Sequence, residues 1–388
     1  MDELDQFRTE VRAWLEANCP PEMRQPMRDE SDACWGGRNP SFKNEAQRQW
    51  LERMAERGWT VPDWPSEYGG GGLSAAQAKV LKQEMARIGA RNPLMSFGIS
   101  MLGPALLKYG TEEQKQRFLR EIARGEIRWC QGYSEPNAGS DLAALQTKAE
   151  DRGDHWLVNG QKVWTSYADQ ADWIFCLVRT DTQAPKHLGI SFLLFDMATP
   201  GVSTKPILLT SGYSPFCETF FDDVQVPKDQ VVGTVNRGWD VAKYLLGHER
   251  EMISGMGLGG SSNEALGAAF AKELREDPLL RADMTRFDVD SLAFRAMSER
   301  FMDELKAGKA HPAQPSMMKY AGTELNKRRH ELVMAAGGSG ALEWESDASR
   351  GGKAAREWLR TKANSIEGGT SEIQLNIVAK RILNLPGA

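Results

Sequence analysis

Hydrophobic residues near the start of the chain recur every three or four positions, the spacing of the buried face of an amphipathic helix. The first of them are Leu4, Phe7, Val11, Trp14 and Leu15. The string Thr-Glu-Glu-Gln at 111–114 has the form of a capping box, and Ser74 is a candidate helix cap. We therefore predict an all-helical N-terminal domain over residues 1–128.

The pattern then changes to short β-rich runs separated by turn signals, which predicts a β domain over residues 129–237. Asn159-Gly160, flanked by apolar and aromatic residues, predicts a β-hairpin turn. Helical spacing returns afterwards and predicts a C-terminal helical bundle over residues 238–388. The predicted fold class is α+β: a helical domain, a β-barrel-like middle domain and a helical bundle, with no alternation typical of a parallel nucleotide-binding sheet.

Composition excludes several functions. The 388 residues carry 48 Lys and Arg against 53 Asp and Glu, a formal charge of −5, which does not suggest a nucleic-acid carrier. Five cysteines without a CxxC pair favour reduced thiols over disulfides or a zinc site, so no metal is expected. No apolar run is long enough for a membrane helix, and the acidic start does not resemble a signal peptide. We expect a cytoplasmic protein.

One tempting motif is rejected. Residues 255–260 read Gly-Met-Gly-Leu-Gly-Gly and match the spacing GxGxxG. That fingerprint holds a dinucleotide only where the glycines join a strand to a helix. Here a helical pattern over 241–253 precedes the glycines, so we interpret them as small residues on a helix that something large approaches.

Three other segments carry more information. They read GYSEPNAGSDL at 132–142, GQKVWTS at 160–166 and SIEGGTSEIQ at 365–374. Taken singly, they are a turn-rich loop that could bring amides close to an oxyanion, a strand with an aromatic face, and a helix start suited to an anion. An ordinary turn, a core tryptophan and a capped helix are the alternative interpretations.

Together, in this order and spacing, the three segments resemble the acyl-CoA dehydrogenase family over nearly the whole chain. The resemblance implies FAD between the β domain and the C-terminal helices, with the N-terminal helices completing the acyl pocket. It implies that Trp164 covers the flavin face, that Ser166 donates near N5, and that Gly139 and Ser140 meet the pyrophosphate. The implied cofactor-binding residues are Gln131, Tyr133, Ser134, Gly139, Ser140, Trp164, Thr165, Ser166, Gly369, Thr370 and Glu372.

Oxidation of an acyl thioester at Cα–Cβ needs a base for the α-proton. Many family members carry it in the C-terminal loop, but here that place is Gly368 and the glutamate lies one position early, at Glu367. Another branch carries its base on the first long helix after the β domain, where this chain has Gly-His-Glu-Arg at 247–250. We predict that Glu249 is the base, with Glu367 as the alternative. The simpler interpretation of Glu249 is an ordinary glutamate on the surface of a helix, with no catalytic role. The implied substrate contacts are Ser140, Arg250 and Gly368.

The family's Arg-x-x-Phe-Gly string, which grips FAD across a subunit interface, is missing after the predicted Glu249 helix. In this respect the chain resembles the large subunits of two-component enzymes such as pimeloyl-CoA and steroid-degrading acyl-CoA dehydrogenases. It also resembles them in its ending, IEGGTSEIQLNIVAKRILNLP. The resemblance implies a heterotetramer with a homologous small subunit, a homotetramer being the alternative. It further implies an electron-transferring flavoprotein as acceptor, and small residues after Glu249 suggest a bulky, long or ω-carboxylated acyl group.

Two other functions stay open at this point. The chain could be a non-catalytic or partly catalytic subunit of a heteromeric acyl-CoA dehydrogenase. It could also be a flavin oxidase or monooxygenase of the same fold.

Overall fold

The computed structural model describes residues 3–27, 30–256, 267, 270–347 and 349–386, and for residues 248–256 it describes the backbone alone. The glycine string at 255–260 thus lies outside the residues whose side chains are described. Contacts divide the chain into two compact units. The first comprises Met1–Pro206 and Phe216–Leu245, and the second comprises Ile207–Pro215 and Leu246–Ala388.

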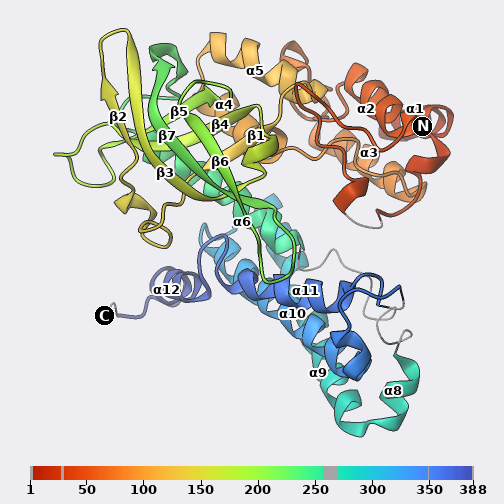
Figure 1. Ribbon diagram of the computed structural model, residues 1–388. Coiled ribbons are helices and arrows are strands. Elements are labelled where there is room, and N and C mark those ends of the chain that lie inside the picture. The colour runs from red at the N-terminus through yellow and green to blue at the C-terminus, as the bar shows by residue number, and fades with distance from the viewer. Residues whose placement is uncertain (1–2, 28–29, 257–266, 268–269, 348, 387–388) are drawn as a thin grey trace. The chain divides into compact units, whose positions relative to one another are not determined.

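The N-terminal segment is helical, as predicted (Figure 1). Ser74 and Thr111 each form the reciprocal capping box expected of a helix start. The buried face that begins with Val11 and Leu15 packs with Trp50, Met54 and Leu81 into one apolar core. The helices are α1 (Glu3–Asn18), α2 (Glu45–Glu56), α3 (Ala75–Arg87), a π-helical turn at Gly98–Leu102, α4 (Gly103–Tyr109) and α5 (Glu112–Arg124).

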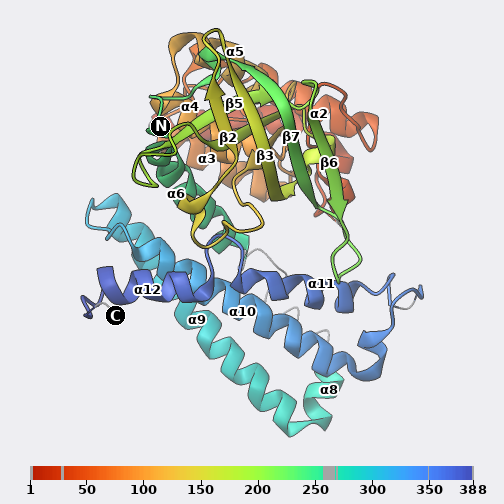
Figure 2. The ribbon, with the colours of Figure 1, turned by 60° about the vertical axis from the view of Figure 1, so that its left-hand side comes forward.

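The middle segment forms a seven-stranded mixed sheet in the order β1-β4-β2-β3-β7-β6, with β5 paired to β4. Figure 2 shows β2, β3, β7 and β6 in this order. The long strands β3 and β7 pair antiparallel, and β4 is buried along its whole length. The strands are β1 (Trp129–Gly132), β2 (Lys148–Asp151), β3 (His155–Ser166), β4 (Trp173–Arg179), β5 (Ile190–Asp196), β6 (Val202–Ile207) and β7 (Phe216–Pro227).

The predicted hairpin at Asn159-Gly160 is wrong, because β3 runs through both residues without a turn. A register shift against β7 between Val158 and Gly160 marks a bulge instead. A Cβ on Gly160 would lie 2.6 Å from Thr147 Oγ1, and the Asn159 amide donates to Asp223 Oδ1 at 2.9 Å. Asn-Gly here serves a bulge and a close backbone approach, which need the same permissive residues as a turn.

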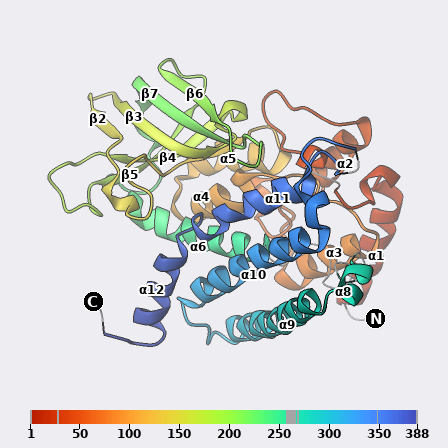
Figure 3. The ribbon, with the colours of Figure 1, turned by 60° about the horizontal axis from the view of Figure 1, so that its bottom comes forward.

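The described residues after the sheet are mainly helical, and the boundary between the two units falls inside α6 (Gly238–Met256). In the second unit, α10 packs against α9, α11 and α12, and α9 and α10 run side by side (Figure 3). The core of this bundle includes Met284, Phe287, Phe294 and Met318. The helices are α8 (Ala271–Glu276), α9 (Pro278–Lys306), α10 (Gln314–Gly337), α11 (Lys353–Thr361) and α12 (Ser371–Arg381).

Candidate functional site

The loop after β1 presents an open tip on a fixed base. Glu135 and Ala138 exchange both backbone hydrogen bonds, at 3.1 and 3.0 Å, and so close a tight turn. Beyond it Gly139 and Ser140 are exposed, and a Cβ added to Gly139 would meet no atom within 4 Å. The backbone at the tip is therefore accessible to a ligand from outside the sheet.

A buried ion pair lies under this loop. Lys162, fully buried in β3, donates from Nζ to Glu135 Oε1 at 2.7 Å and to the Tyr133 carbonyl at 3.1 Å. The Glu135 carboxylate also accepts the N–H groups of Gln146 and Thr147 at 2.6 and 2.9 Å. Burial alone would raise the pKa of Glu135, but Lys162 and the amide donors hold it below its usual value. The Glu135 carboxylate is thus held in its ionised form.

A second bulge in β3 turns Trp164 outward. The register shifts between Lys162 and Thr165, and Trp164 has a φ of 61°, a left-handed value that is strained for an aromatic residue. Its indole is 55% exposed, while its edge contacts the Phe216 ring at 6.0 Å between centroids. The Val163 N–H donates to the Ser134 carbonyl at 2.9 Å, which joins the bulge to the loop.

The other predicted cofactor residues of this unit differ in exposure. Gln131, Ser134 and Ser166 are half-buried, and Tyr133 is buried with its ring against the edges of two phenylalanines, Phe175 and Phe192. Thr165 is fully buried, and its Oγ1 has no hydrogen-bond partner among the described residues. The Thr165 side chain therefore faces the sheet interior, whereas its neighbour Trp164 faces out.

The second unit holds the C-terminal motif. Gly368 and Gly369 have φ values of 65° and 89°, and the Gln374 amide donates to both of their carbonyls, at 2.9 and 3.3 Å. Thr370 caps α12 by accepting the Ile373 N–H at 3.2 Å, and Glu372 lies exposed in its first turn. A capped helix start after two left-handed glycines is an arrangement that suits an anionic or polar ligand.

Glu367 has its oxygens occupied. Arg360 donates to Glu367 Oε2 at 2.9 Å and to Oε1 at 3.3 Å, and the Asn364 amide donates to Oε1 at 2.5 Å. The guanidinium and the amide fix the orientation of the Glu367 carboxylate and leave it fewer free lone pairs for a substrate proton. This geometry favours a structural role for Glu367 over that of a catalytic base.

Two lysines of helix α10 bind the segment that precedes Gly368. Lys319 is fully buried and donates to the Asn364 carbonyl at 2.9 Å, while Lys327 donates to Ser365 Oγ at 2.6 Å. Burial lowers the pKa of Lys319, and Glu367, Glu324 and Glu372 oppose this shift. The segment that precedes Gly368 is thus fixed by buried and half-buried polar contacts.

The two predicted residues Glu249 and Arg250 lie on α6, but their side chains lie outside the described residues. The first turns of α6 belong to the first unit, where Val241, Ala242 and Leu245 are buried.

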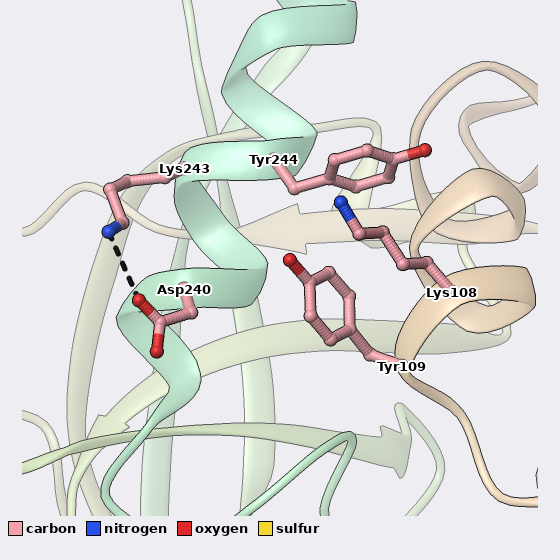
Figure 4. A pocket seen from close by; sticks show the side chains of 5 residues that line it. All are labelled: Lys108, Tyr109, Asp240, Lys243 and Tyr244. Carbon is pink, nitrogen blue, oxygen red and sulfur yellow. Dashed lines mark ion pairs between the residues drawn. The ribbon is translucent and has the colours of Figure 1, made fainter.

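Beside these turns lies a shallow cavity of about 560 Å³ that the sequence did not predict (Figure 4). The Lys108 ammonium lies 4.1 Å from the ring centroid of Tyr244, and Lys243 pairs with Asp240 at 3.0 Å. Tyr109 completes the lining. None of these residues belongs to the three motifs.

Sequence reasoning missed the side chains that support the motifs, above all Glu135, Lys162 and Lys319. One signal was present: in β3 the inward positions include Trp156, Val158 and Lys162, so a lysine fell on the buried face. A lysine there requires a partner, and Glu135 lies in the neighbouring motif. The described residues contain no cluster of His, Cys, Asp or Glu that could hold a metal ion, and no described helix is long and apolar enough to cross a membrane.

Comparisons with known proteins agree over the full length. Family models for the acyl-CoA dehydrogenase N-terminal, middle and C-terminal domains match residues 1–126, 130–224 and 236–383. Acyl-CoA dehydrogenase IpdE1 of Mycobacterium tuberculosis is 36% identical over 411 aligned residues, which cover 100% of this chain and 99% of the relative.

Solved structures give the same result. The steroid ACAD Tcur3481-Tcur3483 matches with a TM-score of 0.78 and 30% identity, covering 100% of both chains. The ChsE4-ChsE5 complex of Mycobacterium tuberculosis matches with a TM-score of 0.74 and 29% identity, covering 100% of this chain and 99% of that chain.

Proposed function

Because this chain belongs to the acyl-CoA dehydrogenase family, we propose that it uses FAD to oxidise an acyl-CoA thioester to the trans-2-enoyl-CoA. The chain is an oxidoreductase of that family, and its fold is the family's three-domain arrangement of helices, curled sheet and helices. The observation that carries the cofactor assignment is the outward Trp164: an indole 55% exposed on a strained bulge is costly unless a ligand covers it.

The residues present fit a flavin dinucleotide. Trp164 offers an aromatic face, and the open backbone at Gly139 and Ser140 can approach phosphate oxygens. In the second unit, the start of α12 at Thr370 is a capped helix N-terminus whose amides suit an anionic or polar group. When bound, FAD accepts the hydride that leaves Cβ of the acyl chain.

We assign removal of the α-proton to Glu249. The alternative carboxylate, Glu367, is engaged by Arg360 and Asn364. The place of the C-terminal base in other members is occupied here by Gly368, which has no side chain to supply one. Arg250 and the backbone of Gly368 are the proposed contacts of the thioester, where donors would stabilise charge on the carbonyl oxygen.

The proposed substrates carry a bulky, long or ω-carboxylated acyl group. Small residues follow Glu249 in the sequence, and one structural relative, Tcur3481-Tcur3483, is described as a steroid ACAD. Turnover should be measured on butanoyl-, pimeloyl- and steroid-derived CoA thioesters. We expect the larger thioesters to give the higher kcat/KM, and a clear preference for butanoyl-CoA would reject this substrate class.

The reaction itself is tested by its product and its acceptor. With an electron-transferring flavoprotein as acceptor, mass spectrometry should find a thioester that has lost two hydrogens relative to the substrate. Rapid reaction of the reduced protein with oxygen would indicate an oxidase instead. A purified complex that binds FAD but leaves every thioester unchanged would contradict the proposal.

A further inference from the structure

Lys162 is an unusual residue to find inside a sheet. Its side chain is fully buried, and among the largest fully buried side chains of the described residues only it and Lys319 carry a charge. Taking an ammonium and a carboxylate out of water is costly, and well-packed apolar residues often replace such a pair without loss of stability. Stability alone is therefore a weak reason for an ion pair at this position.

The contacts of Lys162 suggest a more specific reason. Its Nζ is bonded to the Tyr133 carbonyl and to Glu135, which lie on either side of Ser134. The next residue in β3, Val163, donates its N–H to the Ser134 carbonyl at 2.9 Å. Three consecutive residues of the loop are thus fixed by two consecutive residues of the strand.

Trp164 comes directly after these two strand residues. Any movement of the loop relative to β3 would change the distance between Trp164 and the open backbone that begins at Gly139. Glu135 adds a second restraint, because its carboxylate also binds the N–H groups of Gln146 and Thr147 on the far side of the loop. Both ends of the loop are therefore tied to the one buried ammonium.

We propose that Lys162, held by Glu135, is a positioning residue that locks the loop at 133–140 and the Trp164 bulge into one rigid surface for the flavin. It touches no reacting atom and acts through the backbone at Tyr133 and Ser134. This inference rests on the proposed function, since it assumes that the surface receives FAD.

The test compares Lys162→Met, Glu135→Gln and the double variant E135Q/K162M with the unmodified full-length chain, in the complex in which it binds FAD. The double variant removes both charges, so no unpaired charge is buried, yet it still lacks the ammonium that binds Tyr133. Val226→Ala is the control. Val226 is fully buried in the core of the middle sheet, so its truncation lowers the stability of the chain without removing a hydrogen bond of the loop.

Two readouts separate positioning from stability. In the double variant we expect the dissociation constant of FAD to rise at least about tenfold above that of Val226→Ala, although both variants unfold at similar denaturant concentrations. In the flavin-free chain we expect the amide of Val163 to exchange its hydrogen faster in the double variant and unchanged in the control. Either single variant that folds should weaken FAD binding as well.

The inference is overturned if the double variant binds FAD as tightly as Val226→Ala does, or if its Val163 amide keeps its protection. An unmodified chain that never binds flavin would refute the proposed function. Even then, hydrogen exchange at Val163 would decide whether Lys162 holds the loop.

Discussion

At the scale of single residues, the candidate site combines strain and exposure at Trp164 with a buried charge at Lys162. Neither is favourable for an empty protein. A tryptophan at a φ of 61° costs about 1–3 kcal/mol, and Trp164 is 55% exposed to water. Strained backbone and exposed aromatic rings are concentrated at ligand-binding sites, where the bound ligand offsets their free-energy cost.

This gives a prediction for Trp164→Gly. Glycine relieves the left-handed strain, while the loss of the edge contact with Phe216 opposes the gain, so the stability of the flavin-free chain should change by less than about 1 kcal/mol. The affinity for FAD should fall at least about tenfold because the aromatic cover is gone. Urea denaturation and a FAD titration measure the two effects.

The control for this variant is Arg350→Gly. Arg350 is exposed and has a φ of 52°, so glycine relieves comparable strain at a position outside the three motifs. Its affinity for FAD should match that of the unmodified chain. Equal FAD affinity in the two glycine variants would show that Trp164 does not cover the flavin.

At the scale of elements, α1 and α3 are joined by one carboxylate. The side chain of Glu84 on α3 is 3% exposed. It forms ion pairs with Arg8 and Arg12 of α1, at 3.0 Å each, and with Arg87 of its own helix, at 2.6 Å. The hydrogen bond from Arg12, opposed by burial and reinforced by Arg87 and Arg8, lowers the pKa of Glu84 from 4.5 to about 2. The ionised form is therefore the one that stabilises the fold.

The sign of the pH dependence follows. A carboxyl whose pKa is lower in the folded chain stabilises it fully above its usual pKa, and the effect is lost as pH falls toward the folded value. Glu84→Gln should lower the unfolding free energy by about 2 kcal/mol near pH 7, the size expected for hydrogen bonds between charged groups. The difference from the unmodified chain should shrink between about pH 4.5 and pH 2.

The measurement is chemical denaturation of the Glu84→Gln variant at several pH values, and Glu45→Gln is its matched control. The pKa of Glu45 is also lowered to about 2, by hydrogen bonds from Arg48 and Gln49, but the group is exposed. Solvent screens such a pair, so its replacement should have a much smaller effect. Equal losses from the two variants, or a constant loss for Glu84→Gln down to pH 2, would contradict this account.

The sequence predicted the element types better than their connections. Helical spacing at Val11 and Leu15 and the capping boxes at Ser74 and Thr111 led to the observed helices, because these signals are local. Asn159-Gly160 misled, because a bulge against β7 needs the same residues as a turn, and only the partner strand decides between them.

The same limit applies to the site. The motifs could be located because each is a continuous string, and Trp164 and Thr370 lie within them. The ion pair of Glu135 with Lys162 could not be read directly, since it joins residues that fold together from different segments. The bonds that engage Glu367 likewise come from α11 and the turn after it, which pattern alone does not place.

At the scale of the whole molecule, we expect FAD binding to depend on assembly with a second subunit. The family string that grips FAD across a subunit interface is missing, and structural relatives include the ChsE4-ChsE5 complex. Helix α9 carries several exposed apolar side chains, and contiguous exposed apolar surface is typical of a face that another protein covers. These side chains are Leu279, Val289, Leu292, Met302 and Leu305.

We therefore predict that the chain purified alone binds little FAD, and that co-expression with a homologous small subunit restores a full complement. Flavin content per chain and the mass in solution measure this directly. Leu292→Glu should weaken assembly and leave the fold intact, because Leu292 is 60% exposed. A homotetramer of this chain that is saturated with FAD would contradict the prediction.

The most direct test of the central claim is anaerobic reduction of the bound flavin by an acyl-CoA substrate, followed through its visible absorbance in a stopped-flow instrument. Replacing Glu249 by Gln should slow this step at least about a hundredfold, because the α-proton loses its base. Replacing Glu367 by Gln should change the rate less than about tenfold, since that carboxylate is engaged by Arg360. A normal rate in the Glu249 variant together with a lost rate in the Glu367 variant would contradict the account.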